Sequence, residues 1–199
     1  MNIPNALSIL RILLIPLYAW VYFAAPEVAI GEPVAMEYIW AAVILLVSGL
    51  TDLFDGMIAR RFNMITKLGR FLDPCADKLT QATVTVLLAI RHPEWIVLPI
   101  LYIGKELLML IGGMILMRKF KDIAPSRWYG KLATGIFYGA MILLVAFPMM
   151  PMLWSNILVV LTIVSTVFAF AMYFPLYFKL YRKQQPMVDE KQKAHSSEC

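Results

Sequence analysis

Six long apolar stretches divide this chain and leave little sequence outside them. They lie at roughly 7–25, 36–51, 76–91, 95–117, 132–150 and 153–178. A segment of about 20 apolar residues is long enough to cross the hydrocarbon core of a bilayer as an α-helix. Within lipid, backbone N–H and C=O groups must be satisfied internally, and a helix does this. The pattern therefore predicts an all-α integral membrane protein with six transmembrane helices.

The composition favours one membrane domain. Of 199 residues, 61% are hydrophobic and 16% are charged, whereas about a quarter of a soluble domain is charged. Residues 1–183 are predicted to form the membrane domain. Residues 184–199 are polar and lack an apolar pattern, so a disordered cytoplasmic tail is predicted there.

The N-terminal run is expected to stay in the mature protein. Arg11 interrupts its apolar residues and no small-residue cleavage site follows, which argues against a signal peptide. Pro4 and Asn5 precede the apolar run. A short interfacial helix or simply the start of the first span fits this pattern, and we expect the interfacial helix.

Basic residues cluster in alternate connections: between spans two and three, between spans four and five, and after span six. The opposite connections hold mainly acids, namely Glu27, Glu32, Glu37 and Glu94. By the positive-inside rule, both termini and the polar segment 52–77 are predicted to be cytoplasmic, at a plasma membrane. The net charge of +5 would then meet anionic headgroups. No nucleic-acid partner is expected, because no basic stripe lies outside a membrane flank.

Four aspartates fall in this polar segment. Asp52 and Asp55 are three residues apart, and Asp73 and Asp77 are four apart, so each pair shares one face of a helix. The second and third apolar stretches are short for a span, and both are expected to continue as helix into the segment. Pro74 is expected at the first helical position, with Asp73 as the N-cap.

Four carboxylates beside a membrane repel one another unless cations lie between them. Oxygen ligands select hard cations such as Mg²⁺, Mn²⁺ or Ca²⁺. Two such ions about 4 Å apart suit a displacement at phosphorus. Gly56 and Gly69 would let a pyrophosphate approach the backbone, and Arg60 can bind a phosphate oxygen. Solvated loop acids are the ordinary alternative, but four acids at helical spacing beside two glycines and an arginine argue against it.

The full spacing is Asp52-x2-Asp55-Gly56-x2-Ala59-Arg60-x8-Gly69-x3-Asp73-x3-Asp77. It resembles, with no departure, the signature of the CDP-alcohol phosphatidyltransferases, and the six-helix topology extends the likeness to nearly the whole chain except the tail. The resemblance implies that Asp52, Asp55 and Asp73 bind metal, and that Asp77 lies near the metals and acts as general base. It implies a CDP site lined by Gly56, Ala59, Arg60 and Gly69. It also implies CDP-diacylglycerol as donor, two Mg²⁺ or Mn²⁺ ions per site, and a homodimer.

The acceptor alcohol is less constrained. The opening run 2–12 and the run 126–134 resemble phosphatidylglycerophosphate synthases and their cardiolipin-synthase relatives. This implies glycerol 3-phosphate as acceptor, with phosphatidylglycerol or inositol phosphate as alternatives. A phosphorylated acceptor needs cations, and the candidates are Lys105, Arg118 and Lys131.

Other roles for these cations stay open. Lys105 and Glu106 lie in the middle of a span, where they can form an internal ion pair, and Lys131 can anchor a helix at the headgroups. Glycerophosphate-type members often carry arginine where this chain has Lys105, which leaves the acceptor open. A magnesium transporter is a competing class. It predicts acids at mid-membrane in several spans, whereas these four gather at one edge.

Overall fold

The structure of the chain is a computed structural model that describes residues 3–27, 33–61, 69–120, 128–172 and 175. It describes the backbone alone at residues 3–5, 53, 55–61, 69–74, 110 and 112–120. The predicted tail, residues 184–199, lies outside the described residues.

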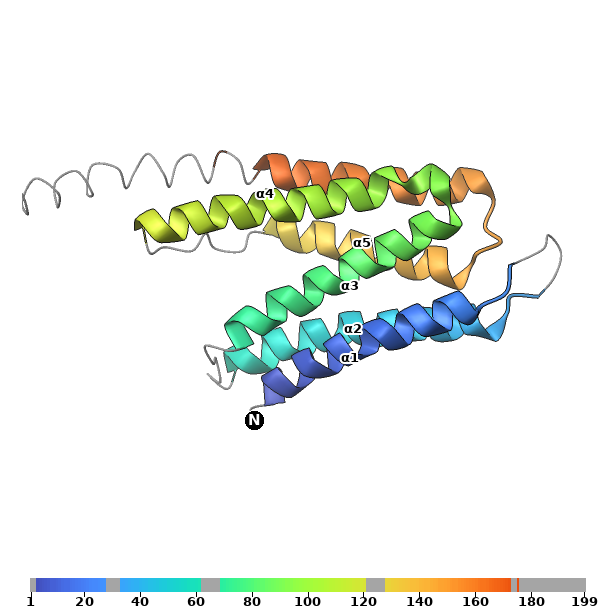
Figure 1. The fold of residues 1–199 in the computed structure, drawn as a ribbon, viewed down its shortest axis with the longest axis horizontal. Coiled ribbons are helices and arrows are strands. Elements are labelled where there is room, and N and C mark those ends of the chain that lie inside the picture. Colours follow the sequence, from blue (N-terminus) through green and yellow to red (C-terminus); the bar gives the residue numbers. More distant parts are fainter. Residues whose placement is uncertain (1–2, 28–32, 62–68, 121–127, 173–174, 176–199) are drawn as a thin grey trace, which may run out of the picture.

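Every regular element in the described residues is a helix (Figure 1). In chain order these are α1 (Ile3–Ala24), α2 (Met36–Arg61), α3 (Gly69–Arg91), the 3-10 helix η1 (Pro93–Trp95), α4 (Val97–Phe120) and α5 (Trp128–Ala146). A sixth long helix, Met152–Met172, follows. The predicted all-α class is confirmed.

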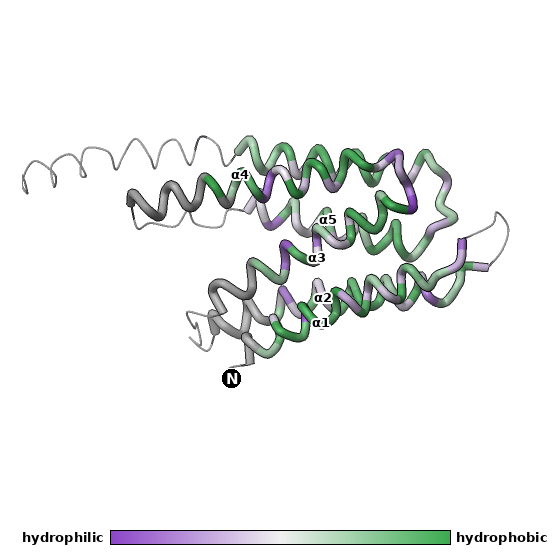
Figure 2. The backbone as a smooth tube through the Cα atoms, in the orientation of Figure 1, coloured by the Kyte–Doolittle hydropathy of each residue, from purple (hydrophilic) through white to green (hydrophobic). Residues whose placement is uncertain are grey.

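The outer surface of the helices is apolar. Three helices are long and apolar enough to cross a membrane: Ala6–Ala24, Trp128–Ala146 and Met152–Met172. Figure 2 shows mainly hydrophobic helices, interrupted by few hydrophilic positions. Large side chains such as Trp20 (71% exposed) and Leu153 (69% exposed) point outward. Soluble monomers rarely carry apolar surface on this scale, so these features favour a membrane protein. The crossing of a bilayer by all six helices stays a prediction.

Two local predictions were wrong. Residues 3–24 form one continuous helix, with no separate interfacial helix before the first span. Pro4 lies in the first turn, where its missing N–H costs no intrahelical hydrogen bond, so it does not interrupt α1. Pro74 is not the first helical residue, because α3 already begins at Gly69. Asp73 is therefore inside α3 and is not its N-cap.

The helices pack against one another in a defined set of pairs. Helix α1 packs against α2 and α3, α2 against α5, and α3 against α4, so α3 runs obliquely between α1 and α4 (Figure 1). The core between these helices is built from aromatic and aliphatic side chains. Among its fully buried members are Tyr18, Tyr22, Leu45, Leu98 and Phe137.

Three buried threonine hydroxyls are satisfied within their own helices. The Oγ1 atoms of Thr80, Thr85 and Thr162 each donate to the carbonyl oxygen four residues earlier, at 2.9, 2.9 and 2.8 Å. Such bonds remove the cost of burying a hydroxyl without a partner. Threonine can therefore occupy the helix interfaces.

Candidate active site

The four signature aspartates lie on two helices. Helix α2 continues without a break to Arg61, and α3 begins at Gly69. The prediction that both helices extend beyond their apolar stretches is therefore confirmed, because i, i+4 hydrogen bonding does not depend on side-chain polarity. Both aspartate pairs lie on helical backbone, which gives each pair the predicted common face.

Asp52 on α2 is paired with an arginine from α1. The Arg11 Nη1 atom donates a hydrogen bond of 2.5 Å to Asp52 Oδ1. The Arg11 side chain is fully buried, whereas that of Asp52 is 30% exposed. Removing one partner of such a pair leaves an uncompensated buried charge, which is strongly unfavourable. Helix α1 thus supplies a cation to the acidic site.

Asp77 on α3 accepts hydrogen bonds from two residues. The Tyr138 hydroxyl on α5 donates to Asp77 Oδ1 at 3.1 Å. The Gln81 Nε2 atom lies 3.2 Å from both carboxylate oxygens, and Lys78 Nζ lies 3.9 Å from Oδ2. The Asp77 side chain is 15% exposed. Its carboxylate is therefore held by donors from two helices while part of it stays accessible.

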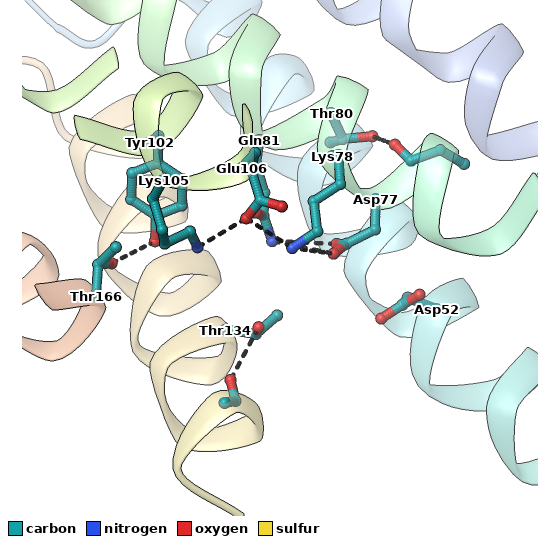
Figure 3. Close-up of polar contacts among 12 residues, drawn as sticks. Asp52, Asp77, Lys78, Thr80, Gln81, Tyr102, Lys105, Glu106, Thr134 and Thr166 are labelled. Carbon is teal, nitrogen blue, oxygen red and sulfur yellow. Dashed lines mark hydrogen bonds and ion pairs between the residues drawn. The ribbon is translucent and has the colours of Figure 1, made fainter. Parts of the chain in front are cut away.

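A network of three charges adjoins Asp77 (Figure 3). The Glu106 Oε1 atom on α4 accepts from Lys78 Nζ at 2.9 Å and from Lys105 Nζ at 2.8 Å. The Lys105 ammonium also lies 4.8 Å from the centre of the Tyr102 ring, within cation–π range. Two ammonium groups share one carboxylate, so the network carries a net positive charge beside Asp77.

A profile of the CDP-alcohol phosphatidyltransferase family matches residues 1–174. The chain belongs to this family. It is 37% identical over 137 residues to the CDP-diacylglycerol--glycerol-3-phosphate 3-phosphatidyltransferase of Escherichia coli strain K12, a match that covers 67% of this chain and 70% of that protein. Proteins of the same name from Shigella flexneri serotype 5b and Shigella sonnei match with the same identity and coverage.

Two of the four signature aspartates are described with their side chains. Asp52 on α2 and Asp77 on α3 lie in the same region of the bundle (Figure 3). Asp55 and Asp73 are described by backbone alone. Among the side chains that the structure describes, no group of three or more His, Cys, Asp or Glu gathers as a metal site. The two described carboxylates offer only oxygen ligands, which fits Mg²⁺ or Mn²⁺.

The predicted CDP-binding residues are placed by their backbone. Gly56, Ala59 and Arg60 lie in the last turns of α2, and Gly69 is the first residue of α3. Their side chains lie outside the described part of the chain. Their role in this phosphatidyltransferase family member therefore stays a prediction.

The three acceptor-binding candidates are not brought together in the described residues. Lys105 joins the network beside Asp77, and its internal ion pair with Glu106 is present. Lys131 is exposed in the first turn of α5. Arg118 lies on α4, where only the backbone is described. Of the three, the structure connects Lys105 to the acidic site.

Three residues that contact the signature aspartates were not predicted as site residues from the sequence: Arg11, Gln81 and Tyr138. Arg11 carried a usable signal, because an ionisable residue inside an apolar span is a functional hypothesis by default. Gln81 follows Asp77 by four residues, a helical spacing that permits their hydrogen bond. Tyr138 had no sequence signal, since its contact joins residues 61 positions apart.

Proposed function

We propose that this chain transfers the phosphatidyl group of CDP-diacylglycerol to a hydroxyl of glycerol 3-phosphate. The products are phosphatidylglycerophosphate and CMP, and the reaction belongs to phospholipid biosynthesis. Family membership and the relatives of that name support the reaction class. The observation that carries the choice of acceptor is the pair of lysines beside Asp77, because a phosphate monoester dianion needs positive charge close to the base.

The reaction requires a base next to the acceptor hydroxyl. Asp77 accepts the hydroxyl proton, the hydroxyl oxygen bonds to the β-phosphorus, and the bond to CMP breaks with its electron pair leaving on CMP. A carboxylate is a weak base. Much of the rate must therefore come from holding Asp77 and the hydroxyl at the right distance and orientation. The hydrogen bonds from Gln81 and Tyr138 supply that restraint on the Asp77 side.

Asp52, Asp55, Asp73 and Asp77 are the proposed ligands of two Mg²⁺ or Mn²⁺ ions. Bound there, the ions would neutralise the pyrophosphate and stabilise charge on departing CMP. Arg11 already compensates Asp52 within the protein. Gly56, Ala59, Arg60 and Gly69 are the proposed CDP site.

For the acceptor phosphate we propose Lys105 as the main ligand. Its ammonium is shared with Glu106 and lies in the network that reaches Asp77. Arg118 and Lys131 remain proposed contributors from α4 and α5. Phosphatidylglycerol, which would give cardiolipin, and inositol phosphate are the alternative acceptors.

One assay tests the proposed function. The purified protein is incubated with CDP-diacylglycerol, Mg²⁺ and a panel of glycerol 3-phosphate, phosphatidylglycerol and inositol phosphate, and the lipid product is identified. We expect phosphatidylglycerophosphate and one CMP per lipid. Product from another alcohol would reassign the acceptor, and no CMP release with any alcohol would reject the reaction.

We further propose that both termini and the site face the cytoplasm at the plasma membrane, and that two copies form a homodimer. The basic connections support the orientation. Single cysteines replacing Lys67 and Lys121 should react with an impermeant reagent only from the cytoplasmic side, and one replacing Glu32 only from outside. The reverse labelling would overturn the orientation, and a monomeric mass in detergent would contradict the dimer.

A further inference from the structure

Tyr138 contacts two elements of the site at once. Its hydroxyl donates to Asp77 Oδ1 at 3.1 Å. Its ring lies against the backbone of α2 at Gly49, where an added Cβ would stand 3.2 Å from Tyr138 Cδ1 and 3.5 Å from Cε1. Three helices therefore meet at this side chain: α5 carries the ring, α2 supports it, and α3 receives its hydrogen bond.

Gly49 differs from Gly104, Gly135 and Gly139, three other glycines of the described helices. A Cβ added at Gly104, Gly135 or Gly139 would meet no atom within 4 Å. At Gly49 it would come closer to the ring than ordinary van der Waals contact allows. The missing side chain thus lets the ring approach α2 and sets the position of the hydroxyl.

The Tyr138 bond restrains Asp77 in a way that Gln81 cannot. Gln81 lies on α3 one turn beyond Asp77, so it moves with that helix. The tyrosine belongs to α5 and fixes the carboxylate relative to a second helix. A carboxylate has about four lone-pair sites, so the hydrogen bonds from Gln81 and Tyr138 leave Asp77 with acceptor capacity.

We propose that Tyr138 is a positioning residue for the phosphatidyl transfer, and that Gly49 acts through it. This inference rests on the proposed function, because it assigns Asp77 as the base. Tyr138 touches neither donor nor acceptor in this assignment. It holds Asp77 Oδ1 so that the remaining lone pairs face the hydroxyl that loses its proton.

The first test compares Tyr138→Phe with Tyr18→Phe. Tyr18 is buried, and its hydroxyl has no hydrogen-bond partner among the described residues. Loss of a hydrogen bond to a charged group should lower kcat of Tyr138→Phe by about ten- to a hundredfold. The KM for CDP-diacylglycerol and its binding affinity should stay close to the parent values, whereas the thermal unfolding midpoint should fall modestly because a hydrogen bond between α5 and α3 is lost. The Tyr18→Phe variant should keep the parent kcat.

The second test is a double-mutant cycle between Gly49 and Tyr138. We expect Gly49→Ala to lower kcat several-fold, on the order of tenfold, by displacing the ring, and to have no further effect in the Tyr138→Phe background. Gly139→Ala, an open glycine on the same helix as Tyr138, is the matched control and should retain activity.

The outcomes separate cleanly. Full kcat in Tyr138→Phe, with an active parent enzyme, would overturn the positioning role. Equal losses from Gly49→Ala in both backgrounds would show general packing and would overturn the link through Tyr138. An inactive parent enzyme would instead reject the proposed function. If Tyr138→Phe did not fold, Gly49→Ala alone would decide: an unchanged kcat in that folded variant would reject the proposal.

Discussion

One arginine joins helices at each end of the α1–α2–α3 bundle, and the two arginines have different partners. The end that holds Asp52 is called the acidic or Arg11 half, and the other end the Arg91 half. In the acidic half, Arg11 of α1 pairs with the Asp52 carboxylate of α2. In the opposite half, Arg91 at the end of α3 donates to the backbone oxygens of Tyr22 and Ala25, at 2.8 and 2.5 Å, near the end of α1.

The Arg91 half is closed by neutral groups. Its guanidinium also donates to the Tyr38 hydroxyl and lies 4.9 and 5.4 Å from the ring centres of Tyr22 and Tyr38. The last carbonyls of a helix have no intrahelical donor, and a cation there is favourable. Arg91 therefore serves as a permanent cap for α1.

The Arg11 half is built differently, because its arginine pairs with a carboxylate that is also a proposed metal ligand. A neutral carbonyl cap has no such competitor. The same three helices are thus joined by a neutral carbonyl cap in one half and, in the other, by an ion pair for which the proposed metal ions would compete.

Metal removal should have the largest effect, and this effect should be confined to the Arg11 half. EDTA should abolish CMP release completely, and Mg²⁺ or Mn²⁺ should restore it, because no protein cation replaces divalent charge at the pyrophosphate. Hydrogen exchange of the amides near Arg91 should not change. Full activity in metal-free buffer would contradict the two-ion proposal.

Loss of the proposed general base should have the next largest effect on turnover. Asp77→Asn keeps the size of the side chain but cannot accept a proton, so turnover should fall by about a hundredfold or more. Affinity for CDP-diacylglycerol with Mg²⁺ should be retained. Glu94→Gln makes the same chemical change in the Arg91 half and should leave turnover unaltered. Near-normal turnover of Asp77→Asn would mean that another group accepts the hydroxyl proton.

The acceptor site should give a smaller and more selective effect. Lys105→Ala should raise the acceptor KM by about ten- to a hundredfold through loss of a charge-assisted hydrogen bond, with little change in affinity for CDP-diacylglycerol. Arg118→Ala and Lys131→Ala are measured beside it. Unchanged acceptor kinetics in all three variants would mean that Lys105 does not bind the acceptor and serves only in its ion pair with Glu106.

The smallest effect tests the two arginines directly. Arg11→Met and Arg91→Met should each lower the free energy of unfolding, by about 1.5–3 kcal/mol for a lost charge-assisted hydrogen bond. A ligand that binds only the folded state stabilises it. Mg²⁺ should therefore raise the unfolding midpoint more in Arg11→Met, where Asp52 has lost its protein cation, than in Arg91→Met. An equal rise in both variants would mean that the two contacts are alike.

Much of the architecture followed from spacing alone. The long apolar runs predicted helices because a backbone in lipid must satisfy its own hydrogen bonds, and the three- and four-residue gaps placed each aspartate pair on one face. The start of α3 was mispredicted, because Pro74 was assigned to the first turn although the helix begins upstream.

The contacts between helices could not be predicted in this way. The Arg11–Asp52 pair joins residues 41 apart, and the Tyr138–Asp77 bond joins residues 61 apart. Helical periodicity tells which residues share a face, but not which neighbouring helix that face meets. The site could therefore be predicted as a set of acids, whereas the groups that hold those acids required the packed structure.

The depth of the carboxylates along their helices has a kinetic consequence. At about 1.5 Å per residue, Asp52 lies about 24 Å along α2 from Met36, and Asp77 about 21 Å along α3 from Arg91. Both lengths are shorter than a hydrocarbon core of about 30 Å. If α2 and α3 cross the bilayer as predicted, with their Met36 and Arg91 ends at one face, a donor lipid would meet the carboxylates without leaving its leaflet. The reaction rate then follows the number of donor molecules per unit area of membrane. Mixing inert lipid into the vesicles would slow turnover at constant total donor, whereas diluting the same vesicles with buffer that holds the acceptor and Mg²⁺ at the same concentrations would not.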